Sequence, residues 1–293
     1  GCDKHCTYCI IPKLRGKFRS VPMERLIAQA EDMAEQGVKE LILVAQETTV
    51  YGKDLYGKKS LHILLKKLCE IRGIRWIRIL YCYPEEIYDE LIETIRDEKK
   101  ICHYLDIPIQ HASDRILKRM GRRTSKQELI DIVGKLRKEI PDIVLRTTLI
   151  TGFPGETEED HEELKEFVDE MEFDRLGVFT YSPEENTPAA EMADQVPEEV
   201  KEERRDELME LQQEISYDRG QDRIGQELLV MIEGKVADES AYIGRTYGDA
   251  PKVDGYIFVQ TGELLMTGDF AKVRVTGALE YDLIGVLGDE YTE

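Results

Sequence analysis

The stretch GCDKHCTYCIIP, residues 1–12, places Cys2, Cys6 and Cys9 in a C-x3-C-x2-C pattern. Three thiolates on one short loop can hold three irons of a cubane iron–sulfur cluster and leave the fourth iron without a protein ligand. Zinc is the alternative, but a structural zinc site needs four ligands, usually supplied as two paired clips. The nearby candidate for a fourth ligand, His5, is pinned between two of the cysteines. The pattern therefore favours a 4Fe-4S cluster with one open iron.

Outward from this loop, apolar runs alternate with helical periodicity. Runs typical of buried strands lie at residues 41–45, 76–81, 104–109, 143–150 and 176–181. Amphipathic helices are predicted at residues 24–37, 61–72, 85–97, 126–139 and 158–171, the last two after capping boxes. This alternation indicates right-handed βαβ units and a parallel sheet. We predict an α/β fold, an open, partial TIM-like β/α barrel whose chemistry lies at the carboxyl ends of its strands.

The texture of the sequence changes near residue 222. Before it, residues 197–219 form a long charged helix, either a connector packed along its leucines or an arm that binds a partner. After it, residues 222–293 hold ten of the 22 glycines and short alternating runs, which predicts a small antiparallel, OB-like β-barrel. We therefore expect two domains, residues 1–221 and residues 222–293.

Composition limits the class of partner. The net charge is −20, which argues against binding nucleic acid through the bulk field and suits a basic partner, unless it only maintains solubility. Residues 222–293 alone carry 14 acidic and six basic side chains, a net charge of −8. No apolar run is long enough for a membrane span. Six cysteines, three of them clustered, indicate a reducing compartment, and we expect a cytoplasmic protein.

The cysteine pattern in a strand–helix series resembles the radical S-adenosylmethionine (SAM) superfamily, and Cys9 to Pro12 with Arg15 and Gly16 resembles its methylthiotransferase branch. The similarity continues at residues 107–111, 120–122, 152–157 and 181–189. The resemblance implies that SAM chelates the open iron and is cleaved reductively to a 5′-deoxyadenosyl radical. It also implies that the C-terminal barrel is a TRAM domain and that a flavodoxin- or ferredoxin-like protein donates electrons.

The same family has an N-terminal domain whose three further cysteines hold a second 4Fe-4S cluster, the one that carries sulfur. By this resemblance the chain is interpreted as a fragment, with the strand expected before Cys2 also missing. Such a fragment should bind one cluster and cleave SAM, and we expect that it cannot complete methylthiolation.

Residues 45–52 and 244–251 resemble the branch members that methylthiolate the β-carbon of an aspartate in the twelfth small-subunit ribosomal protein, a basic substrate. The alternative within the branch is isopentenyladenosine in transfer RNA, and the acidic barrel counts against it. Whether the barrel also binds RNA directly stays open. An alternative of another class is a non-enzymatic, metal-containing protein that binds RNA or assists ribosome assembly; zinc rather than iron would favour it.

Three polar residues near the loop and the first strand are candidate cofactor contacts. Arg15 belongs to a stretch with four basic and no acidic residues and could pair with a carboxylate, although it could equally be exposed loop. Gln46 and Glu47 end a strand at the expected active edge, where the family position suggests the SAM amino group or the substrate. Ordinary solvation at a strand end is the alternative.

A second group of candidates follows the fourth predicted strand. Gly152 and Gly155 would let the backbone approach adenosine closely, with Glu156 beside them, although a turn before a helix is the simpler interpretation. His111 follows the third predicted strand, and a lone histidine there is more often structural than catalytic. We expect three further cysteines to be buried and inert: Cys69, Cys82 and Cys102.

Overall fold

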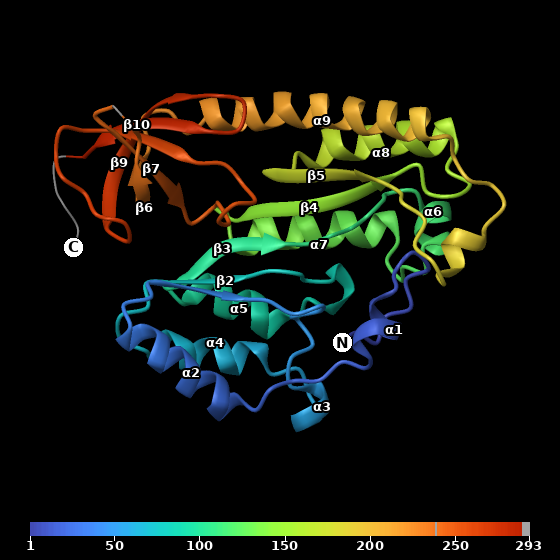
Figure 1. The fold of residues 1–293 in the computed structure, drawn as a ribbon, viewed down its shortest axis with the longest axis horizontal. Coiled ribbons are helices and arrows are strands. Elements are labelled where there is room, and N and C mark those ends of the chain that lie inside the picture. The colour runs from blue at the N-terminus through green and yellow to red at the C-terminus, as the bar shows by residue number, and fades with distance from the viewer. Residues whose placement is uncertain (238, 289–293) are drawn as a thin grey trace. The chain divides into compact units, whose positions relative to one another are not determined.

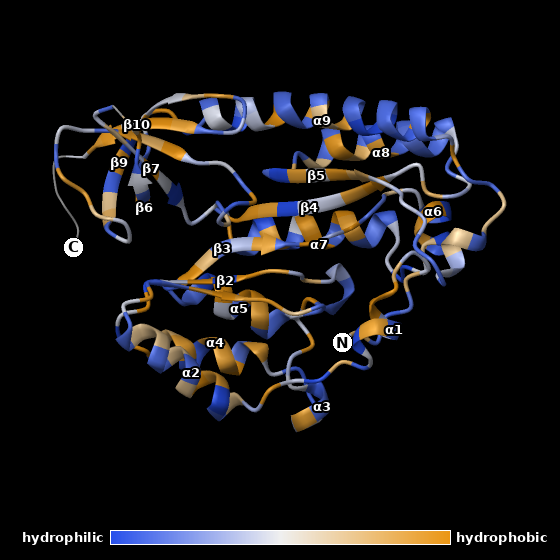
Figure 2. Ribbon diagram, viewed as in Figure 1, coloured by the Kyte–Doolittle hydropathy of each residue, from blue (hydrophilic) through white to orange (hydrophobic). Residues whose placement is uncertain are grey.

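The computed structural model describes residues 1–237 and 239–288. The chain divides into two compact units, Gly1–Leu211 and Gln212–Glu293. The division falls inside the long helix α9, Glu198–Gln221, ten residues before the boundary that composition suggests. Figure 2 shows that α9 is hydrophilic along most of its length.

Within the described residues, the first unit contains a parallel sheet of five strands in the order β1-β2-β3-β4-β5, as the sequence predicts. Each strand pairs only with its neighbours in chain order, so β1 and β5 form the edges (Figure 1). The sheet therefore stays open, as a partial barrel does. The strands are β1 (Glu40–Leu43), β2 (Trp76–Ile79), β3 (Ile101–Asp106), β4 (Val144–Thr151) and β5 (Arg175–Thr180).

Helices connect these strands, and α2 packs on α4, α4 on α5, and α5 on α7. Ser125 and Thr157 close the predicted capping boxes at the starts of α7 and α8. The helices are α1 (Ile11–Arg15), α2 (Met23–Glu35), α3 (Lys53–Tyr56), α4 (Leu61–Cys69), α5 (Asp89–Asp97), α6 (Asp114–Arg119), α7 (Lys126–Glu139) and α8 (Glu158–Met171), with short 3-10 turns η1 (Pro84–Glu86) and η2 (Pro188–Glu191).

Two predicted elements begin three or four residues away from their predicted starts. Strand β3 lies three residues earlier than the apolar run at 104–109, because the sheet begins to pair at Ile101 and Pro108 has no N–H to donate. The helix predicted from residue 85 begins at Asp89, because Pro84 starts a separate 3-10 turn.

The second unit contains a closed barrel in the order β10-β8-β7-β6-β9. The predicted small barrel is therefore confirmed, although the β10–β8 pair that closes it is parallel. Gly244 lies where a Cβ atom would overlap the Val230 side chain, so the close approach of β6 and β7 requires glycine there. The strands are β6 (Glu227–Lys235), β7 (Ala241–Thr246), β8 (Ile257–Gln260), β9 (Phe270–Ala278) and β10 (Leu283–Leu287).

Among the described residues, no helix has both the length and the apolar composition that a membrane crossing requires.

Candidate functional site

The cysteine loop rests on the segment that follows α6. The amide of Thr7 donates to the carbonyl of Met120 (2.9 Å), and the Thr7 hydroxyl donates to the carbonyl of Arg119 (2.8 Å). At its other end, the amide of Cys2 donates to the carbonyl of Gly16 (3.1 Å). The loop is therefore fixed by backbone contacts on both sides, which orders the three cysteines before any ligand binds.

All three cysteines of this loop are free thiols. Cys2 and Cys6 are buried, and Cys9 is partly buried. The amide of Lys4 donates to Cys2 Sγ (3.4 Å), and Cys6 Sγ lies 3.3 Å from the Tyr83 hydroxyl. Burial raises the pKa of the Cys2 thiol, and the neighbouring Cys6 and Cys9 raise it further. Burial therefore favours the protonated form of the Cys2 thiol, and a metal centre would have to replace that proton.

In the described part of the chain, no three His, Cys, Asp or Glu side chains are placed so that they could hold a metal ion. A cubane cluster spreads its three thiolates over three irons instead of gathering them on one. Three unpaired, mostly buried thiols on one fixed loop, with an amide N–H directed at one sulfur, are a donor set that fits such a cluster.

A cavity of about 290 Å³ opens beside the loop, lined by residues that include Cys2, Lys4, Phe18 and Glu47. Glu47 is 2% exposed, and its Oε2 atom has no hydrogen-bond partner in the described part of the chain. Burial raises the pKa of Glu47 to about 7, although the Thr49 amide (3.0 Å) and hydroxyl donate to its Oε1 atom. The wall of the cavity therefore includes a carboxylate that has one oxygen available to accept a hydrogen bond.

The structure separates the other polar candidates from this cavity. Gln46 precedes Glu47 but is exposed, and Arg15 is exposed at the end of α1. Of the three, only Glu47 lines the cavity next to Cys2 in the described structure. The roles of Gln46 and Arg15 stay predictions.

Side chains of this chain occupy the space beside the two glycines of the loop that follows β4. Gly152 and Gly155 have positive φ angles of 67° and 83°, the conformation that favours glycine. A Cβ atom on Gly152 would overlap the Lys201 side chain, and one on Gly155 would overlap Asp194. The two glycines thus accommodate side chains of this chain, and their predicted role toward adenosine stays untested.

Glu156 lies at the centre of a buried ion network. Arg204 Nη1 donates to Glu156 Oε1 (2.9 Å), and His111 Nε2 lies 3.5 Å from Glu156 Oε2. Burial raises the pKa of Glu156, but the contacts with His111 and Arg204 outweigh burial and leave it below its ordinary value. His111 is fully buried, and its Nδ1 accepts from the Ser113 amide (3.0 Å). Both residues therefore hold the loop after β4 in place, which favours the structural interpretation of His111.

The remaining cysteines agree only in part with the prediction that they are buried and inert. Cys82 and Cys102 are buried, and Cys69 is partly buried. Burial raises the pKa of Cys69 to about 11. A thiol with so high a pKa is a poor nucleophile at neutral pH.

Two residues at the loop, Tyr83 and Arg122, could not be predicted from the sequence. Tyr83 contacts Cys6, and the guanidinium carbon of Arg122 lies 4.2 Å from the centre of the Tyr83 ring. Arg122 belongs to the motif at residues 120–122. That motif supported the resemblance, but no role was predicted for Arg122.

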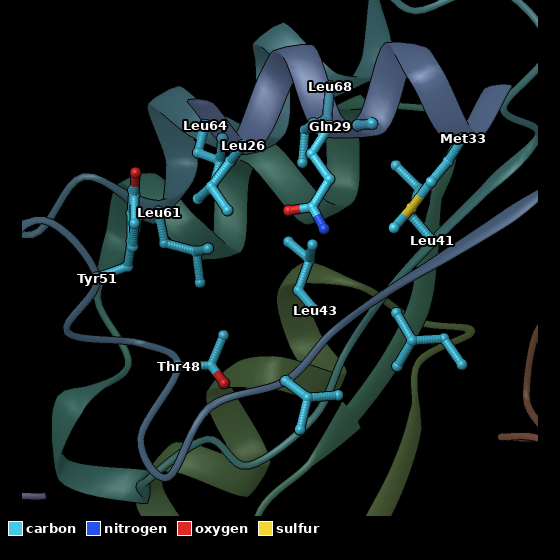
Figure 3. Close-up of a pocket in the computed structure, with 13 residues that line it drawn as sticks. Leu26, Gln29, Met33, Leu41, Leu43, Thr48, Tyr51, Leu61, Leu64 and Leu68 are labelled. Atoms are coloured by element: carbon cyan, nitrogen blue, oxygen red, sulfur yellow. The ribbon is translucent and has the colours of Figure 1, made fainter. Parts of the chain in front are cut away.

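A second, apolar cavity of about 280 Å³ lies between α2, α4 and the edge strand β1. Figure 3 shows Leu26, Gln29 and Met33 of α2 facing Leu41 and Leu43 of β1 across it. No cysteine is among its lining residues in the described structure.

An open parallel β/α sheet with a three-cysteine loop is the architecture of one enzyme class. A model of the radical SAM superfamily matches residues 1–168, more than half of the chain, and a TRAM domain model matches residues 224–287. The chain belongs to the radical SAM superfamily. Membership of this superfamily implies a 4Fe-4S cluster and SAM.

Curated relatives at high identity carry the description ribosomal protein uS12 methylthiotransferase RimO. The protein of Lachnoclostridium phytofermentans is 68% identical over 97% of this chain and 65% of its own length. Those of Clostridium botulinum (strain Langeland) and Clostridium perfringens (strain ATCC 13124) are 54% and 56% identical, over 100% and 99% of this chain. The chain spans about 65% of the length of these relatives.

Solved structures share the fold at low identity. Coproporphyrinogen III oxidase (HemN) of Escherichia coli, a radical SAM enzyme, aligns with a TM-score of 0.54 and 18% identity, over 93% of this chain and 64% of that one. The radical SAM methyltransferase TsrM of Kitasatospora setae aligns with a TM-score of 0.54 and 16% identity, over 65% and 37%. At such identities the likeness shows the fold alone.

Proposed function

We propose that Cys2, Cys6 and Cys9 hold the 4Fe-4S cluster and leave one iron open to SAM. When bound, the cluster and SAM supply the one-electron cleavage that generates a 5′-deoxyadenosyl radical. The observation that carries the assignment is the fixed loop of three free thiols, next to a cavity whose wall includes Cys2. The protein's part is to position the cofactor and keep water away from the reaction.

Glu47 orients SAM within this proposal. Its Oε2 atom is buried and has no partner among the described residues, and Glu47 lines the cavity that Cys2 also lines. An ammonium group placed beside Oε2 would complete its hydrogen bonding. Lys4 lines the same cavity but is already paired with Glu85 (3.2 Å) and Glu86 (2.7 Å). Lys4 therefore holds the wall of the cavity, while Glu47 keeps a free acceptor for the cofactor.

The substrate we propose is an aspartate of the twelfth small-subunit ribosomal protein, methylthiolated at its β-carbon. The activity named for the relatives that are 54–68% identical supports it. The barrel segment at residues 222–293 carries a net charge of −8, which attracts a basic protein and repels phosphate. Transfer RNA is the alternative substrate, since TRAM-type barrels belong to an OB-like architecture that binds nucleic acid in other proteins.

Three finer parts belong to the same proposal. A preceding domain, outside this chain, holds the second 4Fe-4S cluster. A flavodoxin- or ferredoxin-like protein supplies the electron. The reaction takes place in the cytoplasm, where a reducing environment keeps the cysteines as thiols.

The test is a gene deletion in the host, followed by intact mass spectrometry of the twelfth small-subunit ribosomal protein. We expect that protein to lose the mass of one methylthio group while transfer RNA digests stay unchanged. An unchanged ribosomal protein together with loss of methylthio-adenosine from transfer RNA would leave the radical chemistry standing and overturn the substrate.

A further inference from the structure

Arg122 is a buried cation with incomplete hydrogen bonding. Arg122 is 7% exposed, and its Nη2 atom donates to the carbonyl of Pro108 (2.9 Å). Its Nε and Nη1 atoms are buried and have no hydrogen-bond partner among the described residues. An arginine keeps its charge in proteins, so the positive charge is present at every relevant pH.

The described part of the chain supplies no carboxylate within ion-pair distance of this guanidinium. The carboxylate that acts on Arg122 from further away is Glu85. Its Oε1 binds Lys4 (3.2 Å), and its Oε2 accepts from the Thr124 hydroxyl (2.9 Å). Burying a charge without an ionic partner is unfavourable, because the charge loses its hydration and no opposite charge compensates for that loss. The structure therefore maintains a positive charge that another negative group should balance.

The surroundings of Arg122 point to the cysteine loop as the place of that group. The guanidinium stacks on the Tyr83 ring (4.2 Å to the ring centre), and the Tyr83 hydroxyl lies 3.3 Å from Cys6 Sγ. The residue before Arg122, Gly121, has a φ of 72°, and a Cβ atom there would lie 2.7 Å from the carbonyl oxygen of His5. Arg122 thus belongs to the wall against which the cysteine loop rests.

We propose that Arg122 is the counter-charge of the iron–sulfur cluster and sets its reduction potential, an inference that rests on the assignment of the cluster to Cys2, Cys6 and Cys9. A 4Fe-4S cluster bound by three thiolates is negatively charged, and one-electron reduction adds a further negative charge without forming or breaking a bond. A buried cation stabilises the reduced form more than the oxidised form, which raises the potential. Low-potential one-electron donors can then reduce the cluster more readily.

The experiment is a redox titration of the reconstituted protein, with dithionite as reductant and the reduced cluster followed by electron paramagnetic resonance. Arg122→Gln removes the charge, and Arg122→Lys keeps it. The matched control is Arg78→Gln, because Arg78 is also buried and lies 4.6 Å over a tyrosine ring, that of Tyr104, but is paired with Glu40 (2.9 Å). Iron and sulfide are counted for every variant.

At a fixed poised potential, we expect Arg122→Gln to show about a tenfold lower ratio of reduced to oxidised cluster, which is about 59 mV for a one-electron couple. Arg122→Lys and Arg78→Gln should stay near the parent. Loss of iron in Arg122→Gln alone, with Arg122→Lys and Arg78→Gln fully loaded, would also support the counter-charge.

Four results would overturn the proposal. One is a parent-like potential and iron content in Arg122→Gln. Another is a shift of the reduction potential in Arg78→Gln that is as large as the shift in Arg122→Gln. A further one is an Arg122→Lys variant that behaves like Arg122→Gln. Either result would mean that the substitutions act by loosening the fold in general. A parent protein without any cluster would overturn the cysteine assignment and the counter-charge together, whereas a loaded parent with no shift would overturn the counter-charge alone.

Discussion

Glu47 is the residue whose chemistry depends most directly on its place in the fold. Because it follows strand β1 and turns inward, its carboxylate is 2% exposed and lines the cavity beside Cys2. Burial raises its pKa to about 7, so protonated and ionised forms are both populated near neutral pH. Only the ionised form can pair with an ammonium group.

We expect the affinity for SAM to rise with pH through this range. With a pKa of about 7, the ionised fraction climbs from about a tenth at pH 6 to about nine-tenths at pH 8. Anaerobic titration calorimetry should show that rise in the parent and a weaker, flatter dependence in Glu47→Gln. The exposed Glu24→Gln is the control variant. Parallel pH profiles for the parent and Glu47→Gln would rule out Glu47 as the partner of the amino group.

The sequence predicts the cysteine loop because all three thiols lie within eight positions. It also predicts Glu47, because a polar residue that ends a buried strand reaches the active edge of a parallel sheet. It could not predict Tyr83, which meets Cys6 across 77 positions, or Arg122, because such contacts arise only when the strands are arranged in space. Nor could spacing show that Lys201 and Asp194 fill the space beside Gly152 and Gly155.

At the scale of elements, α9 holds the segments that follow β4 and β5. Lys201 Nζ donates to the carbonyl of Tyr181 (2.9 Å), and Arg204 pairs with the buried Glu156 (2.9 Å). The polar side of this charged helix therefore binds a loop in the first unit, through residues that a hydropathy pattern would place in solvent.

Breaking the Arg204–Glu156 pair should destabilise the first unit. Arg204→Met leaves the buried Glu156 carboxylate without its arginine partner, beside His111 and the Phe153 amide, which should lower the free energy of unfolding by about 3–5 kcal/mol. The double variant Arg204→Met, Glu156→Gln should recover most of that loss, because it removes the uncompensated charge. Urea unfolding followed by circular dichroism measures both values, and a double variant as unstable as the single one would contradict the argument.

Helices of more than two turns were predictable from the sequence, while shorter helices were not. Helix α7 coincides with its prediction because a capping box and several turns of periodicity define it. Helices α1, α3 and α6 have five, four and six residues, too few to show a period of 3.6. In the barrel, alternation predicts strands, but it carries no information on which strand closes the ring, so the parallel β10–β8 pair was not foreseen.

At the scale of the molecule, the excess of acidic residues should govern association with the substrate. A net charge of −20 attracts a basic ribosomal protein, and salt screens that attraction. We expect the affinity for the twelfth small-subunit ribosomal protein, measured by fluorescence anisotropy, to fall steadily as salt is raised. An affinity that is insensitive to salt, or tighter binding of transfer RNA than of the protein, would contradict the electrostatic argument.

The chain should perform only part of the proposed reaction by itself. If the sulfur-carrying cluster lies in a preceding domain, residues 1–293 reconstituted with iron and sulfide should cleave SAM to 5′-deoxyadenosine and methionine. They should yield no methylthiolated product from the ribosomal protein, as judged by chromatography and mass spectrometry of the same mixture. Methylthiolated product from this chain alone would refute the proposal that a preceding domain holds the sulfur-carrying cluster.

Within the proposed function, the loop of Cys2, Cys6 and Cys9 drives methylthiolation of the twelfth small-subunit ribosomal protein. The most direct measurement restores the full-length gene to the deletion strain, either as the parent or with Cys6→Ser, and records the intact mass of that ribosomal protein. We predict that the parent restores the mass of one methylthio group and that Cys6→Ser, produced at an equal level, does not. Restoration by Cys6→Ser, or no restoration by the parent, would contradict the claim.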